Sequence, residues 1–218
     1  MTPALNEIES MVWKAARGAG LAWGLAEEMA QAARFLADHG FDWAAPVVDC
    51  LAEVERLQGA LPPPVERDGT WVSAGTGPLS PALCGPLLSD LAGTITIDNP
   101  LRFGRMAEPL LLLPFAARAA EQLHHRFRLA WPGAGFVCHG CDLWCTAEIG
   151  LPKAAEGIVF SLDGAAIPAM GKVERSPGRQ PIADHLRLRL EHWVHRTYVP
   201  ASLESRLAGA GAGLTDND

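Results

Sequence analysis

Hydrophobic and polar residues alternate from Arg126 to Trp131, with Phe127, Leu129 and Trp131 on one set of positions. A period of two is typical of a β-strand that buries one face and exposes the other. A Pro-Gly-Ala-Gly segment follows at 132–135 and predicts a turn. We therefore predict a β-hairpin at the centre of a sheet.

The first sixty residues show the spacing of apolar positions that is typical of amphipathic helices. Thr2-Pro3 can start a first helix, which is broken by the Gly-Ala-Gly at 18–20. A second helix is predicted over 23–38, and Asp42 is expected to cap a third helix that follows it. Together they predict an N-terminal helical layer.

A Leu-Pro-Pro-Pro run at 61–64 cannot continue a helix, and we place a soft boundary there. The two parts are an N-terminal helical segment, 1–60, and an α+β segment, 61–218, which we expect to form one compact domain. The second part is predicted to contain, besides the hairpin, a short strand at 71–73, a helix that starts at Ser80-Pro81 and is disturbed at Gly85-Pro86, a strand at 94–97, a buried helix at 110–123 and a strand at 157–162. The segment at 184–198 alternates like a strand at 186–190 but also repeats like a helix, and its length favours a helix.

Asp163-Gly164 is a strong signal for a two-residue turn, which would pair the strand at 157–162 with 165–167 or with a strand near 172–174. Helices first, strands in the middle and a helix last, without regular β-α alternation, are typical of the α+β class. The predicted fold is therefore α+β, with an N-terminal helical layer packed on a mixed or antiparallel sheet and with additional helices.

The chain has 218 residues, of which 49% are hydrophobic, and this is enough for a sizeable core. Its 18 basic and 25 acidic residues give a formal charge of -7 without a long Lys/Arg cluster, which argues against a nucleic-acid or anionic-membrane surface. The sequence has neither a secretory signal nor a run of eighteen uncharged apolar residues. Five cysteines, an odd number, suit a reducing compartment, so we expect a soluble cytoplasmic protein.

The chain opens with L-N-E-I-E at 5–9, K-A-A-R-G-A-G at 14–20 and W-G-L-A-E-E at 23–28. It closes with T-Y-V-P-A-S at 197–202, G-A-G-A-G at 209–213 and D-N-D at 216–218. These motifs resemble those of an uncharacterised bacterial family catalogued only as a domain of unknown function. Its members often have serine where this chain has Ala4, so we expect Thr2 or Asn6 to cap the first helix. The resemblance implies no particular chemistry.

The second arm of the hairpin offers thiols at C-x2-C-x3-C spacing, and these are candidate zinc ligands: Cys138, Cys141 and Cys145, together with His139. A structural zinc site usually needs a second pair of ligands, and the sequence contains no second C-x2-C. The alternatives are a redox or nucleophilic cysteine, or reduced cysteines that pack as small hydrophobes. We favour the last, in which Cys141, Leu143 and Cys145 share one buried strand face. No cofactor is identified, and zinc is not favoured.

Basic residues and glycines precede the second helix, where backbone amides and the helix dipole attract a negative group. The alternative is an ordinary helix-turn-helix corner. At the other end of the chain, a Gly-Ala-Gly-Ala-Gly segment could bring amides against an anion, or it could be a frayed tail. If the two ends met, they would form a polar pocket. The candidate ligand-binding residues are Lys14, Arg17, Gly18, Gly20, Tyr198, Glu204, Arg206, Gly211, Gly213 and Asp216.

Two functions of different classes follow from these patterns. The first is an enzyme or binding protein of intracellular metabolism that uses the polar pocket for a small anionic ligand. The second is a non-catalytic interaction or accessory protein, whose exposed tryptophans would dock a partner or a second copy of the chain. We favour the first. A zinc-stabilised domain is a third interpretation, and we expect neither nucleic acid nor membrane as a partner.

Overall fold

The computed structural model describes residues 2–145, 151–164, 171–175 and 181–198. Its α-helices are α1 (Leu5–Ala19), α2 (Trp23–Asp38), α3 (Ala44–Arg56), α4 (Pro81–Leu91), α5 (Leu113–Leu123) and α6 (Asp184–His195), and its 3-10 helices are η1 (Ala92–Thr94) and η2 (Pro109–Leu112). Its strands are β1 (Pro64–Arg67), β2 (Thr70–Ser73), β3 (Leu101–Phe103), β4 (Met106–Ala107), β5 (Arg126–Trp131), β6 (Ala134–His139), β7 (Asp142–Cys145), β8 (Ala154–Ala155), β9 (Ile158–Leu162) and β10 (Gly171–Lys172). No helix among these residues is long and apolar enough to cross a membrane.

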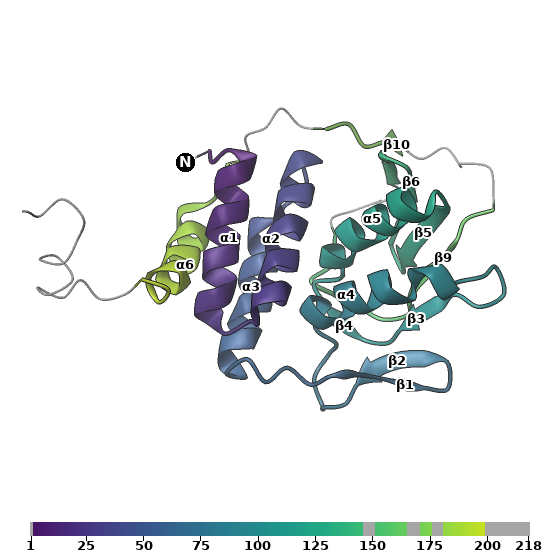
Figure 1. Cartoon of the computed structure of the whole chain (residues 1–218), viewed down its shortest axis with the longest axis horizontal. Helices are drawn as coiled ribbons and strands as arrows, with labels where there is room; N and C mark the ends of the chain where they lie inside the picture. The colour runs from purple at the N-terminus through teal and green to yellow at the C-terminus, as the bar shows by residue number, and fades with distance from the viewer. Residues whose placement is uncertain (1, 146–150, 165–170, 176–180, 199–218) are drawn as a thin grey trace, which may run out of the picture.

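The helices α1, α2, α3 and α6 form a helical layer on one side of the molecule (Figure 1). α1 buries Ile8, Val12, Ala15 and Ala19, which recur at helical spacing, and it contacts each of the other three helices. Small side chains on this face let the neighbouring helices approach α1 closely. The last described helix therefore returns to pack on the first.

The main sheet has the strand order β1-β2-β3-β9-β5-β6-β7-β10. Only β2 and β3 run parallel, and the other neighbouring pairs are antiparallel. The predicted hairpin is formed by β5 and β6, which lie in the middle of the sheet with Leu129 opposite Phe136. α4 and α5 contact α2, and α5 also packs on β5 and β6. Both the α+β class and the central hairpin are thus confirmed.

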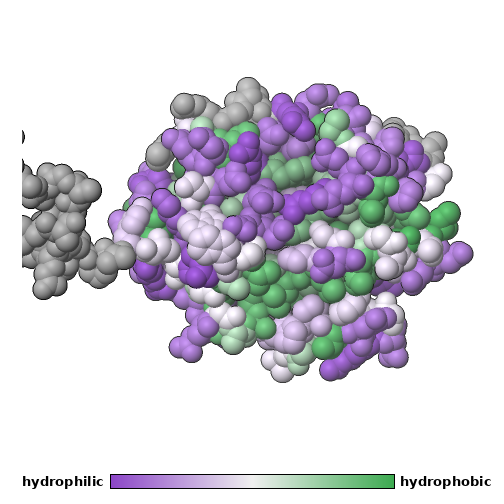
Figure 2. All heavy atoms as spheres, viewed as in Figure 1, coloured by the Kyte–Doolittle hydropathy of each residue, from purple (hydrophilic) through white to green (hydrophobic). Residues whose placement is uncertain are grey.

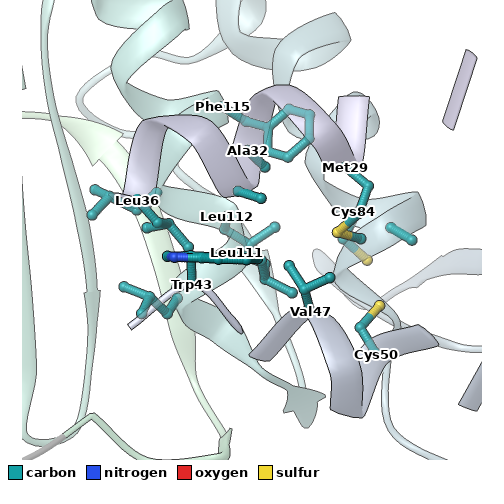
Figure 3. Close-up of a cluster of buried hydrophobic side chains, with 14 of the residues drawn as sticks. Met29, Ala32, Leu36, Trp43, Val47, Cys50, Cys84, Leu111, Leu112 and Phe115 are labelled. Atoms are coloured by element: carbon teal, nitrogen blue, oxygen red, sulfur yellow. The ribbon is translucent and has the colours of Figure 1, made fainter. Parts of the chain in front are cut away.

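Apolar side chains from the helices and the sheet form one continuous core. Figure 3 shows a part of it in which Trp43, just before α3, lies near Leu36 of α2 and Leu111 of η2. Within the sheet, the rings of Phe127 and Phe160 stack with centroids 4.7 Å apart. On the face seen in Figure 2, polar residues cover much of the surface and apolar residues gather in the lower middle of the view. Residues before and after position 60 thus contribute to the same core.

The strand predicted at 94–97 is wrong. The chain forms the helical turn η1 at 92–94, and the side chain of Ile97 is 75% exposed. Thr96 and Asn99 exchange backbone hydrogen bonds in a local turn. β-branched residues favour a strand where a neighbouring strand and a buried face receive them, and Ile97 has neither.

The disturbance predicted at Gly85-Pro86 does not end the helix, because α4 continues through both residues. Gly85 lies against the ring of Phe115 in α5, and a Cβ atom at this position would lie 2.3 Å from that ring. The glycine therefore permits close packing of α4 on α5. Pro86 removes one amide, but tertiary contacts of α4 with α2, α5 and η2 support the helix around it.

The partner predicted near 172–174 for the strand at 157–162 is wrong as well. β9 pairs with β3 on one side and with β5 on the other, while β10 pairs with β7. Residues 165–167, the other predicted partner, lie outside the described residues. Asp163-Gly164 therefore follows β9, but β9 and β10 do not pair with each other as a hairpin.

The helix caps agree only in part with the sequence. Ala4, and not Thr2 or Asn6, is the N-cap residue of α1, and the Glu7 carboxylate accepts a hydrogen bond of 2.7 Å from the Ala4 amide. Asp42 caps the start of α3 as predicted, because its Oδ1 accepts a hydrogen bond of 3.1 Å from the backbone amide of Ala44.

Candidate functional site

An open hollow of about 510 Å³ lies where the end of α1, the start of α2 and the end of α6 meet. We call it the basic hollow. It is lined by Trp13, Lys14, Arg17, Gly18, Trp23, Arg196, Thr197 and Tyr198. Its walls therefore combine three cations with three aromatic rings.

The turn between α1 and α2 brings the first group of these side chains together. Trp13 and Arg17 are four residues apart in α1 and so lie on the same helix face. Gly20 then adopts a left-handed backbone with φ of 113° and ends α1, which returns the chain so that Trp23 starts α2. The Trp13 and Trp23 rings meet edge to face with centroids 4.9 Å apart.

Arg17 is held over the Trp23 ring of this pair. Its guanidinium carbon lies 5.9 Å from the Trp23 ring centroid, and its Nη1 donates a hydrogen bond to the carbonyl of Leu21. These two contacts fix the guanidinium plane at the edge of the hollow.

The close approach of α6 to α1 brings the second group of lining side chains, those that follow α6, to the hollow. A Cβ atom on Gly18 would lie 1.9 Å from the carbonyl oxygen of Trp193, so only glycine permits this crossing. Tyr198 consequently reaches α1, and Nζ of Lys14 lies 5.8 Å from its ring centroid. The hydroxyl of Thr197 donates to the Val194 carbonyl at 2.7 Å and so caps the end of α6.

The three cations differ in how they are balanced. Arg196 donates to Glu55 at 2.6 Å, and Glu55 also pairs with Arg189 at 2.7 Å. Lys14 and Arg17 have no carboxylate within ion-pair distance among the residues that the structure describes. On a chain with a formal charge of -7, the hollow therefore presents, beside aromatic faces, two positive charges that no carboxylate of the described residues pairs with.

The structure brings together four of the residues that the sequence indicated, namely Lys14, Arg17, Gly18 and Tyr198. Gly20 does not line the hollow, because it ends α1 and packs on the backbone of Gly59. The remaining ligand-binding candidates lie outside the described residues: Glu204, Arg206, Gly211, Gly213 and Asp216.

Sequence patterns missed Trp13, Trp23 and Arg196 as parts of this site. The spacing of Trp13 and Arg17 by one helical turn is a signal that could have placed the first of them. The position of Trp23 depends on the tight turn after α1, and that of Arg196 on the packing of α6. Neither is contained in a local pattern.

The four candidate metal ligands do not form a site. Cys138 is fully buried in the sheet, and burial raises the pKa of its thiol to about 12, which opposes both thiolate ligation and nucleophilic attack. Cys141 is exposed, so the prediction that it shares a buried face with Leu143 is wrong. Within the described part of the chain, no three His, Cys, Asp or Glu side chains are grouped so that they could hold a metal ion. His139 is exposed, at the end of β6.

Comparison with known proteins bears on the first helices. No curated protein and no solved structure matches the chain. The closing motifs at 197–218 are not covered by a family match, whereas α1, α2 and most of α3 are covered. The covered part is residues 4–53, which match the model of the family described as "Protein of unknown function (DUF3726)", so the resemblance of the opening to an uncharacterised family is confirmed.

Proposed function

We propose that the chain binds a small anionic ligand with a flat, unsaturated part in the basic hollow. The observation that carries this proposal is the pair Lys14 and Arg17, which have no carboxylate partner among the described residues and lie beside aromatic rings. Guanidinium groups bind carboxylates and phosphates with parallel hydrogen bonds, and they do so more strongly where aromatic surface excludes water.

The geometry suits binding better than covalent chemistry. Trp23 and Tyr198 are 58% and 55% exposed, so their faces are accessible to a ligand. The aliphatic hydroxyl of the lining, that of Thr197, already donates a hydrogen bond to the backbone carbonyl of Val194. A bound anion would contact Lys14 and Arg17, and its flat part would lie on one of the exposed rings. We accordingly propose that the described residues of the hollow serve to bind a metabolite.

Replacing Arg17 with alanine should weaken the binding of such a ligand at least tenfold, because one of the two cations that no described carboxylate pairs with is removed. Benzoate is a suitable probe, with benzamide as its neutral counterpart, and isothermal titration calorimetry or a thermal shift would measure the affinity. At one hundred times its dissociation constant, a bound ligand raises the free energy of unfolding by about 2.7 kcal/mol.

A matched control is Arg34→Ala. Arg34 is a partly exposed arginine of α2 that pairs with Glu9 at 2.6 Å and does not line the hollow. This variant should bind benzoate like the wild type. Equal affinity for benzoate and benzamide, or full binding by Arg17→Ala, would exclude the proposal.

The second candidate is a non-catalytic interaction protein. Trp23 is the large aromatic residue in helix α2 that remains exposed, whereas Trp43, Trp131 and Trp193 are buried. An acidic segment of a partner could therefore dock on the same cations and rings. If small anions fail to bind while an acidic peptide containing an aromatic residue binds and is lost in Arg17→Ala, this candidate replaces the first.

We also propose that the protein works in the cytoplasm. Its five cysteines, an odd number, suit a reducing compartment better than a disulfide framework. The expectations of a bacterial source, of neither nucleic acid nor membrane as partner, and of self-association through exposed aromatic residues stay predictions.

A further inference from the structure

A second hollow, of about 320 Å³, lies between α3, the segment at 75–81 that leads into α4, and the residue before η2. Apolar side chains make much of its wall, including Leu57, Leu61, Pro62 and Pro78. The side chain of Glu108 also lines it. An apolar hollow with a few polar groups is the usual form of a small-molecule site.

Glu108 is held rigidly in an unusual place. Its backbone is left-handed, with φ of 46°, and is fixed by two hydrogen bonds, from its amide to the Lys153 carbonyl at 2.7 Å and from the Leu111 amide to its own carbonyl at 3.0 Å. The residue is only 7% exposed, although charged residues are rarely buried without a partner of opposite charge. Its carboxyl group is hydrogen-bonded to that of Asp49.

The other acids around the hollow already have cations. Asp49 pairs with Lys153 at 2.6 Å, and Glu53 accepts a hydrogen bond of 2.7 Å from Arg56. Glu108 has no cation within ion-pair distance in the described ranges. When it ionises, a largely apolar hollow therefore contains a negative charge that no described residue pairs directly, and the cation near it, Lys153, is already paired with Asp49.

We propose that this hollow binds a small organic amine, with its ammonium group between Glu108 and Asp49 and its apolar body against Leu57, Leu61 and Pro62. The ligand would provide both the missing positive charge and the apolar surface that the walls require. The proposed site differs in place and in ligand charge from the basic hollow, so each can fail without the other.

The charge state of Glu108 makes this binding depend on pH. Burial and the neighbouring Asp49 carboxylate raise the pKa of Glu108 to about 7, with Asp42 acting in the same direction and Lys153 against it. The thiol of Cys50 stays protonated, because burial raises its pKa to about 12. An ammonium ion binds the ionised carboxylate, so its affinity should increase roughly tenfold or more from about pH 5.5 to about pH 8.5.

The test uses the full chain and phenethylamine, with 2-phenylethanol and 3-phenylpropanoate as neutral and anionic counterparts, in NMR or calorimetric titrations. Phenethylamine should bind, the other two should bind at least tenfold more weakly, and Glu108→Gln should reduce amine affinity at least tenfold. Glu66→Gln, at an exposed position of β1, is the matched control and should bind as the wild type does. Absence of amine binding, equal binding of the alcohol, or full binding by Glu108→Gln would overturn the proposal.

A second variant keeps the test decisive if Glu108→Gln does not fold. Ala107→Leu places extra atoms in the wall of the hollow and leaves Glu108 in place. It should abolish phenethylamine binding while benzoate binding at the basic hollow stays unchanged. Retention of amine affinity in this variant would place the amine elsewhere and reject the site.

Glu108 also leads to a prediction for stability. The pKa of this carboxyl group is raised from 4.5 to about 7, so the folded state binds more protons than the unfolded state between these values. The contribution of Glu108 to stability is therefore full below about pH 4.5 and is lost as the pH rises through about 7. Urea denaturation would measure the free energy of unfolding of wild type and of Glu108→Gln at each pH. The value for wild type minus that for the variant should be larger at about pH 5 than at about pH 8. An equal difference in the free energy of unfolding at both pH values would contradict the raised pKa of Glu108 in the folded state.

Discussion

Replacing Trp43 with alanine should lower the free energy of unfolding by about 3–5 kcal/mol, the range for truncating a buried tryptophan to alanine. Trp43 is 1% exposed and lies where α2, α3 and η2 meet (Figure 3). The neighbouring backbones belong to three different elements, which cannot all move to fill the space. Urea or guanidinium denaturation followed by circular dichroism would measure the change.

Two further variants test whether the loss of stability comes from packing at Trp43 or from removal of any large apolar side chain. Ile97→Ala removes an apolar side chain that is 75% exposed, and it should change stability by no more than about 0.5 kcal/mol. Trp43→Phe keeps an aromatic ring and removes an indole nitrogen that has no hydrogen-bond partner among the described residues, so the loss of stability should be smaller than that of Trp43→Ala. A loss below about 1 kcal/mol in Trp43→Ala would mean that this junction is not tightly packed.

Gly18→Ala is expected to have the second largest effect. The added Cβ would lie 1.9 Å from the carbonyl oxygen of Trp193, and this obstacle is backbone that cannot turn away as a side chain could. α6 must therefore shift on α1, at a cost of about 1–3 kcal/mol despite the better helix propensity of alanine. Because Tyr198 and Arg196 move with α6, benzoate binding at the basic hollow should also weaken.

The matched control for this variant is Gly24→Ala in α2. A Cβ atom at this glycine would meet nothing within 4 Å, so alanine should leave stability unchanged or raise it by at most about 1 kcal/mol. Thermal or chemical denaturation of the two variants side by side isolates the effect of the contact with Trp193. If both glycines tolerate alanine equally, the close crossing of α1 and α6 is wrong.

The parts of the fold that could be predicted are those with a clear local period. α2 runs from Trp23 to Asp38 as expected, because its apolar stripe repeats over four turns. The hairpin of β5 and β6 follows from strict alternation before a proline-glycine turn. The β-branched residues at 94–97 have the composition of a strand, yet no strand in the described part of the chain pairs with them, and such a partner cannot be read from the segment itself.

The candidate site was accessible to prediction only in part. Lys14, Arg17 and Gly18 belong to one short motif. The hypothesis that Tyr198 meets them came from the clusters of glycines and charged residues at the two ends of the chain. Trp23 and Arg196 could not be placed, because their positions depend on a turn and on a helix crossing. Glu108 gave no signal, since a single acidic residue before a proline is common in loops and its burial depends on distant side chains.

The packing of α6 on α1 has a consequence for synthesis. The ribosome produces Gly18 long before Trp193, so the apolar face of α1 that α6 covers has no cover while most of the chain is being made. Contacts between residues so far apart in sequence also slow folding, because a long loop must close before they form. A nascent chain that stalls before residue 181 should therefore be a substrate for chaperones that bind apolar helices.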